Sequence, residues 1–217
     1  TVVGTNTTTG CVATMTGAST VNICTSTWTG TTSTDWFTQT NWNPQAVPNL
    51  CAANVVIPSG TPFQPTISGS SVSVGNVNIS SGVTLTLAGQ DMNVCGNWTG
   101  GSSTNAAVIG NGTVIMNSTT ATQNISGNTQ FNILQLNNAQ GAVMAAGSIV
   151  AISTGLHLQT GNLNASAGTL HLLSASASNN SYVDDFSSGF TGTLTGNIIA
   201  DRYIPVVGYN QHFISSP

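Results

Sequence analysis

The chain has 217 residues, 3% of them charged, and a formal net charge of −4. It contains no Lys and no Glu, and Arg202 is its single cation, whereas ordinary soluble domains carry about 25% charged residues. A chain so poor in cations cannot neutralise the phosphates of nucleic acid and has no basic patch for an anionic membrane. No run of 18 apolar residues is present, so we expect no membrane insertion through a helix.

Residues 1–27 are mostly Thr, Ser and Gly, with cysteines at Cys11 and Cys24. We interpret them as an N-terminal strand pair or linker pinned by a disulfide. The other two cysteines are Cys51 and Cys95, and an even number in such a chain indicates disulfides formed in an oxidising compartment. Of three pairings we favour Cys11–Cys24 with Cys51–Cys95, since each closes a loop within one region. The alternative is four buried free thiols. Zinc is disfavoured because the cysteines lack metal-ligand spacing and no His is near them.

Residues 28–58 hold most of the aromatic mass and several prolines. We interpret this segment as an aromatic cap on one end of the fold. Its tryptophans, with Trp98 further on, have two interpretations: core packing, or a platform on which sugar rings stack. The four are Trp28, Trp36, Trp42 and Trp98.

Residues 59–200 alternate apolar and polar positions in short bursts, such as 72–74 (VSV), 83–87 (VTLTL) and 114–116 (VIM). Gly, Asn and Ser separate the bursts, which is typical of short strands with one buried face. Residues 76–100 resemble residues 133–161 at an offset of 57, because both read strand, turn, strand, turn, strand and then Thr-Gly. Residues 112–119 resemble residues 168–175 at an offset of 56.

Self-similarity of short strands at a fixed offset indicates a solenoid, in which each coil buries its inner face against its neighbours. An offset near 56 suits three coils of about 19 residues. We therefore predict an all-β parallel β-helix, or β-solenoid, behind the aromatic cap. A series of β-sandwich repeats is the alternative, because the strand spacing also suits one.

The opening segment reads W-T-G at 28–30, D-W at 35–36, N-W at 41–42, Pro48, and N-V-V-I-P at 54–58. Residues 77–79 (VNI), 82–87 (GVTLTL) and 96–98 (GNW) follow in order. In this order the motifs resemble repeat regions of large surface and adhesin-like proteins of Bacteroidetes, over about residues 28–217. The resemblance implies export, through the type IX route, to the cell surface or the extracellular matrix. It implies no catalytic mechanism.

Residues 201–205 (DRYIP) and 212–217 (HFISSP) resemble the family's junction, so we interpret residues 201–217 as a junction to a further C-terminal region. Asp201 stands where Glu is common in the family, and His212 where an aromatic–Arg pair is common. The sorting domain of such proteins is not in this chain, so we expect the whole protein to be longer.

Catalytic and metal sites have few candidates. Asp184 and Asp185 form the one close acidic pair, but neighbours on a strand point to opposite faces, so a paired-carboxylate site is not expected. We interpret the pair as a solvated turn, with a calcium site using backbone carbonyls as the alternative. His157 and His171 alternate with leucines and could share an outer face as a metal pair, or be simply exposed imidazoles. We expect no catalytic site and no cofactor.

The missing charges also bear on function. Natural sheets protect exposed edges with Lys, Pro and inward charges, and this chain has almost none to use. A neutral Thr, Asn and Ser surface should adhere to itself, to neighbouring surface proteins or to polysaccharide. We expect a structural or adhesive extracellular protein, a subunit of a surface fibre, sheath or adhesin stalk. The alternatives are a carbohydrate-binding module and, less favoured, a degradative β-helix enzyme.

Overall fold

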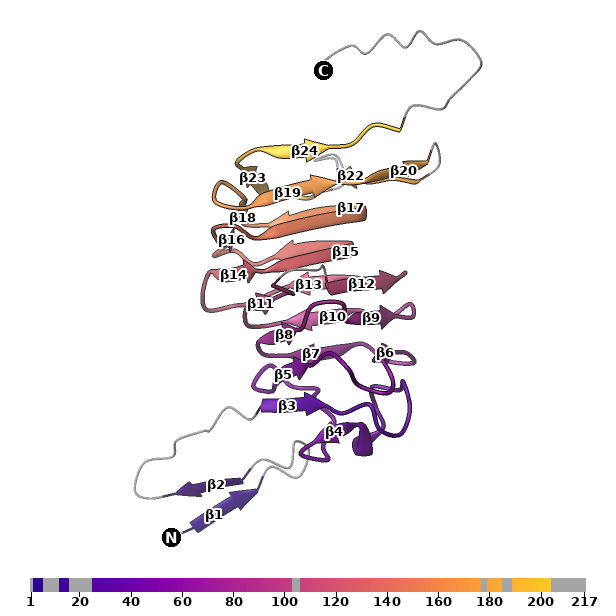
Figure 1. Ribbon diagram of the computed structural model, residues 1–217. Helices are drawn as coiled ribbons and strands as arrows, with labels where there is room; N and C mark the ends of the chain where they lie inside the picture. The colour runs from indigo at the N-terminus through magenta and orange to yellow at the C-terminus, as the bar shows by residue number, and fades with distance from the viewer. Residues whose placement is uncertain are drawn as a thin grey trace, which may run out of the picture.

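The protein is seen in a computed structural model that describes residues 2–5, 12–15, 25–102, 106–176, 179–184 and 189–203. Short strands stack along one axis, with the N-terminal strands at one end and β24 (Ile198–Ala200) at the other (Figure 1). Strands of successive coils pair in parallel, which makes the fold a β-solenoid. The predicted fold is confirmed, and the sandwich alternative is wrong because its sheets would be antiparallel. No described helix is long and apolar enough to cross a membrane.

Each complete coil contributes to three faces. The first face runs in sequence order and is parallel throughout apart from the short edge strand β4 (Trp42–Asn43), which pairs antiparallel with β3. Its parallel strands are β3 (Thr25–Trp28), β5 (Asn54–Ile57), β8 (Val77–Ile79), β11 (Trp98–Thr99), β14 (Gln123–Ser126), β16 (Ala142–Met144), β18 (Asn162–Asn164) and β23 (Thr193–Thr195).

The second and third faces belong to one larger sheet because two long strands turn the corner between them. These are β15 (Asn128–Asn137) and β17 (Ile149–Thr160), whose pairing shifts register between Phe131 and Ile133. The second face also contains β6 (Thr66–Ile67), β9 (Thr84–Leu87), β12 (Ala106–Gly110), β19 (Thr169–Leu172) and β24. The third also contains β7 (Val72–Val74), β10 (Met92–Val94), β13 (Val114–Met116) and β22 (Tyr182–Val183).

Coil length varies more than the sequence predicts. On the first face Val77 pairs with Trp98 and Trp98 pairs with Ile125, so the second of these two coils is longer than the first. The coil from Leu163 to its partner Leu194 is longer still. It contains an antiparallel excursion formed by β20 (Ser174–Ser176) and β21 (Asn179–Asn180).

The predicted period of three equal coils is therefore wrong. The offset found in the sequence aligned Val77, on the first face, with Leu134, on the third. The sequence similarity came from strand alternation and turn chemistry, which are alike on every face, and not from the coil repeat.

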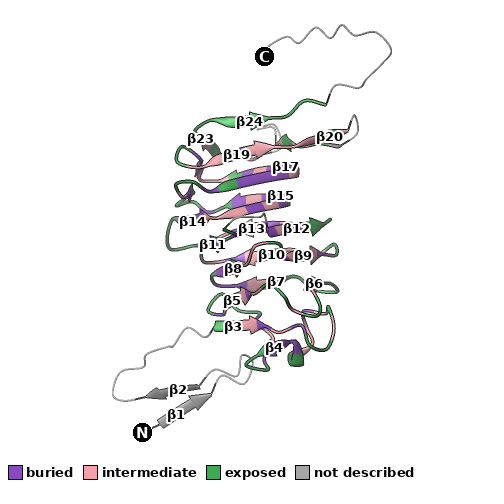
Figure 2. Cartoon of the chain, viewed as in Figure 1, coloured by how far each residue is buried: buried purple, intermediate pink, exposed green. Residues whose placement is uncertain are grey.

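The core fills the interior with columns of stacked apolar side chains, and the purple segments in Figure 2 follow them from coil to coil. One column on the second face joins Leu85, Val108, Phe131 and Ile152 by direct strand pairing, and each is at most 2% exposed. Alternating residues of the same strands point outward, as period-2 alternation requires.

The parallel ladder already begins at β3, whose residue Ser26 pairs with Val55 of β5. The aromatic segment is thus built into the first coils. The predicted boundary at residue 58 had placed it before them. Ahead of it, β1 (Val2–Thr5) and β2 (Val12–Met15) form an antiparallel pair, in agreement with the predicted strand pair. Cys11 and Cys24 lie outside the described residues, as does most of the junction at 201–217.

The predicted Cys51–Cys95 disulfide is present, with the two Cα atoms 5.3 Å apart. It joins the turn before β5 to the turn before β11, across the turn that precedes β8. Gly75 occupies that middle turn, where a Cβ would come within 2.8 Å of the Cys51 carbonyl oxygen. The crosslink therefore joins two coils that are not consecutive in the stack and closes a loop with a sequence separation of 44.

Candidate functional site

Three of the four candidate tryptophans form one cluster at the N-terminal end. Trp36 and Trp42 meet edge to face with ring centroids 4.6 Å apart, and Trp28 and Trp42 do so at 5.0 Å. All three are at most 1% exposed. Edge-to-face pairs of this kind add about 0.5–1.5 kcal/mol to the burial of their area.

The N–H group of every candidate indole also donates a hydrogen bond within the protein. Trp28 donates to Phe63 O at 2.8 Å, Trp36 to Pro48 O at 3.1 Å and Trp42 to Trp36 O at 2.7 Å. Trp98 packs on Phe131 with ring centroids 4.9 Å apart and donates to Thr129 Oγ1 at 2.9 Å. A stacked sugar needs an exposed ring face, so the sugar-platform interpretation of these four residues is wrong and the packing interpretation holds.

The segment between the tryptophans is fixed by a buried asparagine that the sequence did not single out. Asn41 accepts from the backbone N–H groups of Thr32 and Ser33 at 3.0 and 3.1 Å. Its Nδ2 donates to Asp35 O at 2.9 Å and to Ser33 Oγ at 3.1 Å. A fully satisfied buried amide specifies one loop conformation, so the cap is a rigid closure.

The two histidines do not form a pair. His171 lies opposite Ala151 on β17, whereas His157 lies six residues further along that strand, opposite Gln135. Each has its own carboxylate: His157 Nε2 is 3.5 Å from Asp184 Oδ2, and His171 Nε2 is 2.8 Å from Asp201 Oδ1. Their side chains are 20% and 29% exposed and each lies beside a carboxylate, so the interpretation of both as simply exposed imidazoles is wrong.

The calcium alternative rests on Asp184 and Asp185, and Asp185 lies outside the described residues, as does His212. Asp184 faces His157, and the ring centroids of Tyr182 and Phe190 lie 6.1 and 6.0 Å from that of the imidazole. The part of the chain that the structure describes holds no group of three or more His, Cys, Asp or Glu suited to a metal ion.

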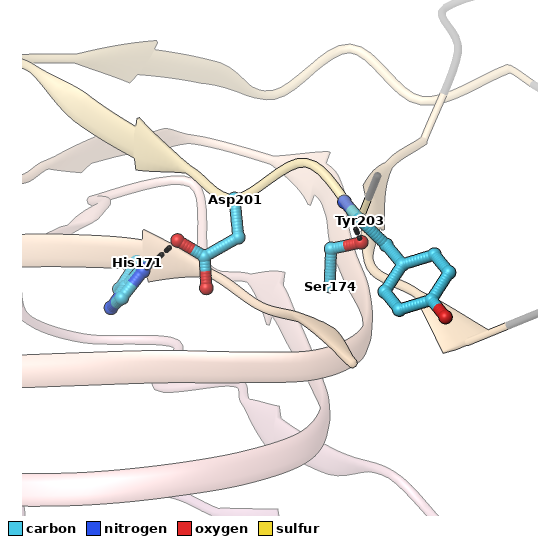
Figure 3. A network of polar contacts seen from close by, with 4 residues as sticks. All are labelled: His171, Ser174, Asp201 and Tyr203. Atoms are coloured by element: carbon cyan, nitrogen blue, oxygen red, sulfur yellow. Dashed lines mark hydrogen bonds and ion pairs between the residues drawn. The ribbon is translucent and has the colours of Figure 1, made fainter. Parts of the chain in front are cut away.

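A second polar group gathers at the C-terminal end, where Figure 3 shows His171, Ser174, Asp201 and Tyr203. Asp201 follows β24 and reaches the imidazole of His171 on β19. The backbone N–H of Tyr203 donates to Ser174 Oγ at 2.9 Å, and the Ser174 hydroxyl is bonded to Asn180. Because Ser174 does not contact the imidazole, the group lacks the nucleophile–base bond of a catalytic triad. It joins β24 to the coil below.

The outer surface of the first face carries an asparagine ladder that sequence reasoning missed. Asn54 Oδ1 accepts from the backbone N–H of Asn76 at 2.9 Å, and Asn76 Oδ1 accepts from that of Asn97 at 2.8 Å. Asn97 Oδ1 in turn accepts from Asn124 N at 2.8 Å. The signal in the sequence was an Asn directly before an inward apolar residue in each of these strands, at Val55, Val77, Trp98 and Ile125. The outer side chains thus bond coil to coil instead of facing a cleft.

Two hollows lie at corners of the solenoid. One, of about 440 Å³, lies where the first face turns into the second and is lined by Ser59, Asn78, Ile79, Ser80, Ser81, Thr99, Gly100, Gly101 and Ser102. The other, of about 430 Å³, lies where the third face turns into the first and is lined by Asn117, Ser118, Thr119, Asn137, Asn138, Ala139, Gln140 and Thr160. Neither lining contains a charged residue, and most of the residues in both linings carry an amide or hydroxyl side chain.

Comparison with known proteins gives no relative from which a function could be carried over. The chain matches no protein-family model, and no curated protein and no solved structure matches it. The fold and the chemistry of its surface are therefore the basis for a functional proposal.

Proposed function

We propose that this chain is a structural and adhesive segment of an extracellular protein, a rod within a surface fibre, sheath or adhesin stalk. The observation that carries the proposal is the continuous parallel ladder from β3 to β23, with outward asparagines bonded from coil to coil. Eight strands at about 4.8 Å spacing make a rod of about 34 Å. Outer side chains of four of these coils thus take part in holding the rod together.

The extracellular location is supported by the chemistry of the crosslink. Disulfides form and persist in oxidising compartments, and Cys51–Cys95 joins two turns of the rod. The motif order that resembles Bacteroidetes surface proteins supports the same location and export through the type IX route. A chain with 3% charged residues and one cation suits contact with neutral neighbours better than contact with nucleic acid or anionic lipid.

The two ends of the rod differ. The N-terminal end is closed by the tryptophan cluster and β4, whereas at the other end β24 pairs with β19 on one side only among the described strands. Its Ile198 and Ile199 are 36% and 51% exposed, and Figure 2 shows this strand in green. An exposed apolar edge strand is a template for further pairing. This exposed strand supports association with another copy or with a neighbouring surface protein.

Electron microscopy of the native surface material, with the purified chain alongside, tests the proposal. We expect filaments or stalks with a regular repeat, and concentration-dependent association of the purified chain in light scattering. The variant Ile199→Lys should reduce this association, whereas Ile109→Lys, an exposed isoleucine within the ladder, should leave it unchanged. Isolated globular particles on the surface and a strictly monomeric purified chain would refute the structural role.

The second candidate function is binding to polysaccharide. Because the tryptophans are buried, they cannot form the sugar-stacking platform first considered for this function. The two uncharged hollows, elsewhere on the molecule, favour polysaccharide binding instead. An adhesive rod and a polysaccharide contact are compatible, because adhesion requires a surface to adhere to.

A further inference from the structure

The hollow between the third and first faces has a wall that neighbouring coils lack. Six residues, 117–122, connect β13 to β14 at this corner. The same corner takes three residues between β10 and β11, four between β15 and β16, and one between β17 and β18. Residues 117–119 of this longer connection line the hollow together with Asn137, Gln140 and Thr160 of the next coils.

Two buried amides hold this wall in place. Gln123 and Asn138 are each 1% exposed, and Asn138 Nδ2 donates to Gln123 Oε1 at 3.1 Å and to Ala121 O at 2.9 Å. Gln123 Oε1 also accepts from Ser118 N at 3.0 Å, and Gln123 Nε2 donates to Val94 O at 2.7 Å. Burying two amides is costly unless their bonds are made, and here the bonds fix the loop in one shape. The hollow is thus formed before any ligand arrives.

The rim of the hollow presents polar groups with no partner among the described residues. These are the Thr119 hydroxyl, the Gln140 side-chain amide and Asn137 Nδ2, and Thr119, Gln140 and Asn137 are all exposed. Asn137 Oδ1 accepts from Thr160 Oγ1 at 3.3 Å, which orients its Nδ2. In the wall behind them, Asn117 Oδ1 is buried with no hydrogen-bond donor in the described structure. A rigid hollow with unused donors and acceptors has the properties of a binding site.

The lining defines the class of ligand by exclusion. No cation is present to hold a phosphate or carboxylate, and no carboxylate to hold a metal or an amine. Amides and hydroxyls predominate over apolar side chains, so an apolar ligand would leave them unpaired at a cost. A neutral ligand rich in hydroxyl groups satisfies both the donors and the acceptors. The volume, about 430 Å³, lies in the range of small-ligand sites.

We propose that this hollow binds a neutral sugar unit of an extracellular polysaccharide, with Thr119, Asn137 and Gln140 as its contact residues. The site gives the adhesive function proposed above a ligand class and rests on the extracellular location proposed there. Without an aromatic face for stacking, affinity for one unit is weak, on the order of millimolar. A polymer that meets many rods on one surface gains avidity without any new contact.

The test is a titration of the ¹⁵N-labelled chain followed by NMR, which reads amide side chains directly. The probes are oligosaccharides of glucose, xylose and N-acetylglucosamine, with oligogalacturonate as the acidic comparison. We expect saturable shifts of the Asn137 and Gln140 side-chain resonances with one or more neutral probes, and weaker or absent shifts with the acidic one. Tighter binding of oligogalacturonate would overturn the neutral class.

Substitutions in the hollow distinguish the loss of ligand contacts from the loss of the folded structure. Thr119→Ala with Gln140→Ala should weaken binding at least about tenfold, since each change removes unpaired hydrogen-bonding groups and no bond of the folded wall. Ala139→Trp, from an exposed position in the lining, should abolish binding by filling the hollow. The matched control is Gln45→Ala, an exposed glutamine in the N-terminal cap, which should leave binding unchanged.

Binding that persists in both hollow variants, or no saturable shift with any neutral probe, overturns the site. Micrographs of the same samples measure the rod and its association independently. Intact filaments without sugar binding therefore reject the sugar site alone, whereas sugar binding by a strictly monomeric chain rejects the self-assembling structural role alone.

Discussion

Asn76 Oδ1 accepts a hydrogen bond from the backbone N–H of Asn97 at 2.8 Å, which ties one coil of the solenoid to the next outside the sheet ladder. Asn76 also donates from its backbone N–H and its Nδ2 to Asn54 Oδ1, at 2.9 and 3.0 Å. One side chain thus links three consecutive coils. An uncharged amide suits this position, because it can donate to one neighbour and accept from the other, and a charged group cannot.

Asn76→Ala should lower the free energy of unfolding by about 1 kcal/mol, because the N–H of Asn97 loses its acceptor at a solvent-exposed position. Urea denaturation followed by far-UV circular dichroism measures the change. The control is Asn78→Ala, which removes an equally exposed asparagine from β8 with no side-chain hydrogen bond in the structure. Equal losses for the two variants would show that the ladder contributes nothing specific.

Replacing both Cys51 and Cys95 with Ser should lower the free energy of unfolding by about 2–4 kcal/mol, since the crosslink closes a long loop in the unfolded chain. Thermal or urea unfolding under non-reducing conditions measures it. Peptide mapping without reduction should first recover a Cys51–Cys95 peptide. Recovery of either cysteine joined to Cys11 or Cys24 would contradict the structure.

Gly161→Ala should destabilise the protein more than Gly147→Ala. Both glycines have left-handed backbone, at φ +85° and +73°, so each substitution carries a strain of about 1–2 kcal/mol. A Cβ at Gly161 would also lie 1.9 Å from Asn138 O, whereas at Gly147 nothing lies within 4 Å. Differential scanning calorimetry of the two variants separates the backbone strain from the steric clash. Equal melting temperatures would contradict the close approach of the coil that carries Gly161 to the coil that carries Asn138.

Tryptophan fluorescence of the folded chain should be blue-shifted and poorly quenched by acrylamide, because all four indoles are at most 1% exposed. Trp36→Ala should cost about 3–5 kcal/mol of stability through lost packing. Binding of neutral sugars should leave the emission spectrum unchanged, because the hollow at Gln140 contains no tryptophan. Strong quenching, or a sugar-induced shift, would restore the tryptophan platform.

The strands were the most predictable part of the molecule. Residues 72–74, 83–87 and 114–116 were expected as strands and contain β7, β9 and β13. Their alternation follows from a sheet with one buried face and needs no knowledge of the partner strand. The Cys51–Cys95 pairing was also foreseen, as the choice that closes a loop within one region.

Other features depended on contacts that span many residues. The burial of Trp36 requires Trp28, Trp42 and Pro48 to converge, and the sequence alone suited an exposed platform equally well. The separation of His157 from His171 depends on register, since β17 is long enough to place them at different positions along one strand. The hollow requires Asn117, Asn137 and Thr160 from three coils, which no local pattern brings together.

The sequence by itself determined an all-β solenoid with a neutral surface and a crosslink near its N-terminal end, because alternation, turn residues, composition and cysteine spacing are local properties. Only the tertiary structure decided the length of each coil, the closure of the N-terminal end by the tryptophan cluster, and which polar groups are used up by neighbouring coils. The physical reason is register: a parallel stack pairs residues whose separation in sequence differs from coil to coil, as Ile125 with Met144 and Leu163 with Leu194 show. A change of one residue in a turn alters which side chains meet, and so which groups remain free to bind.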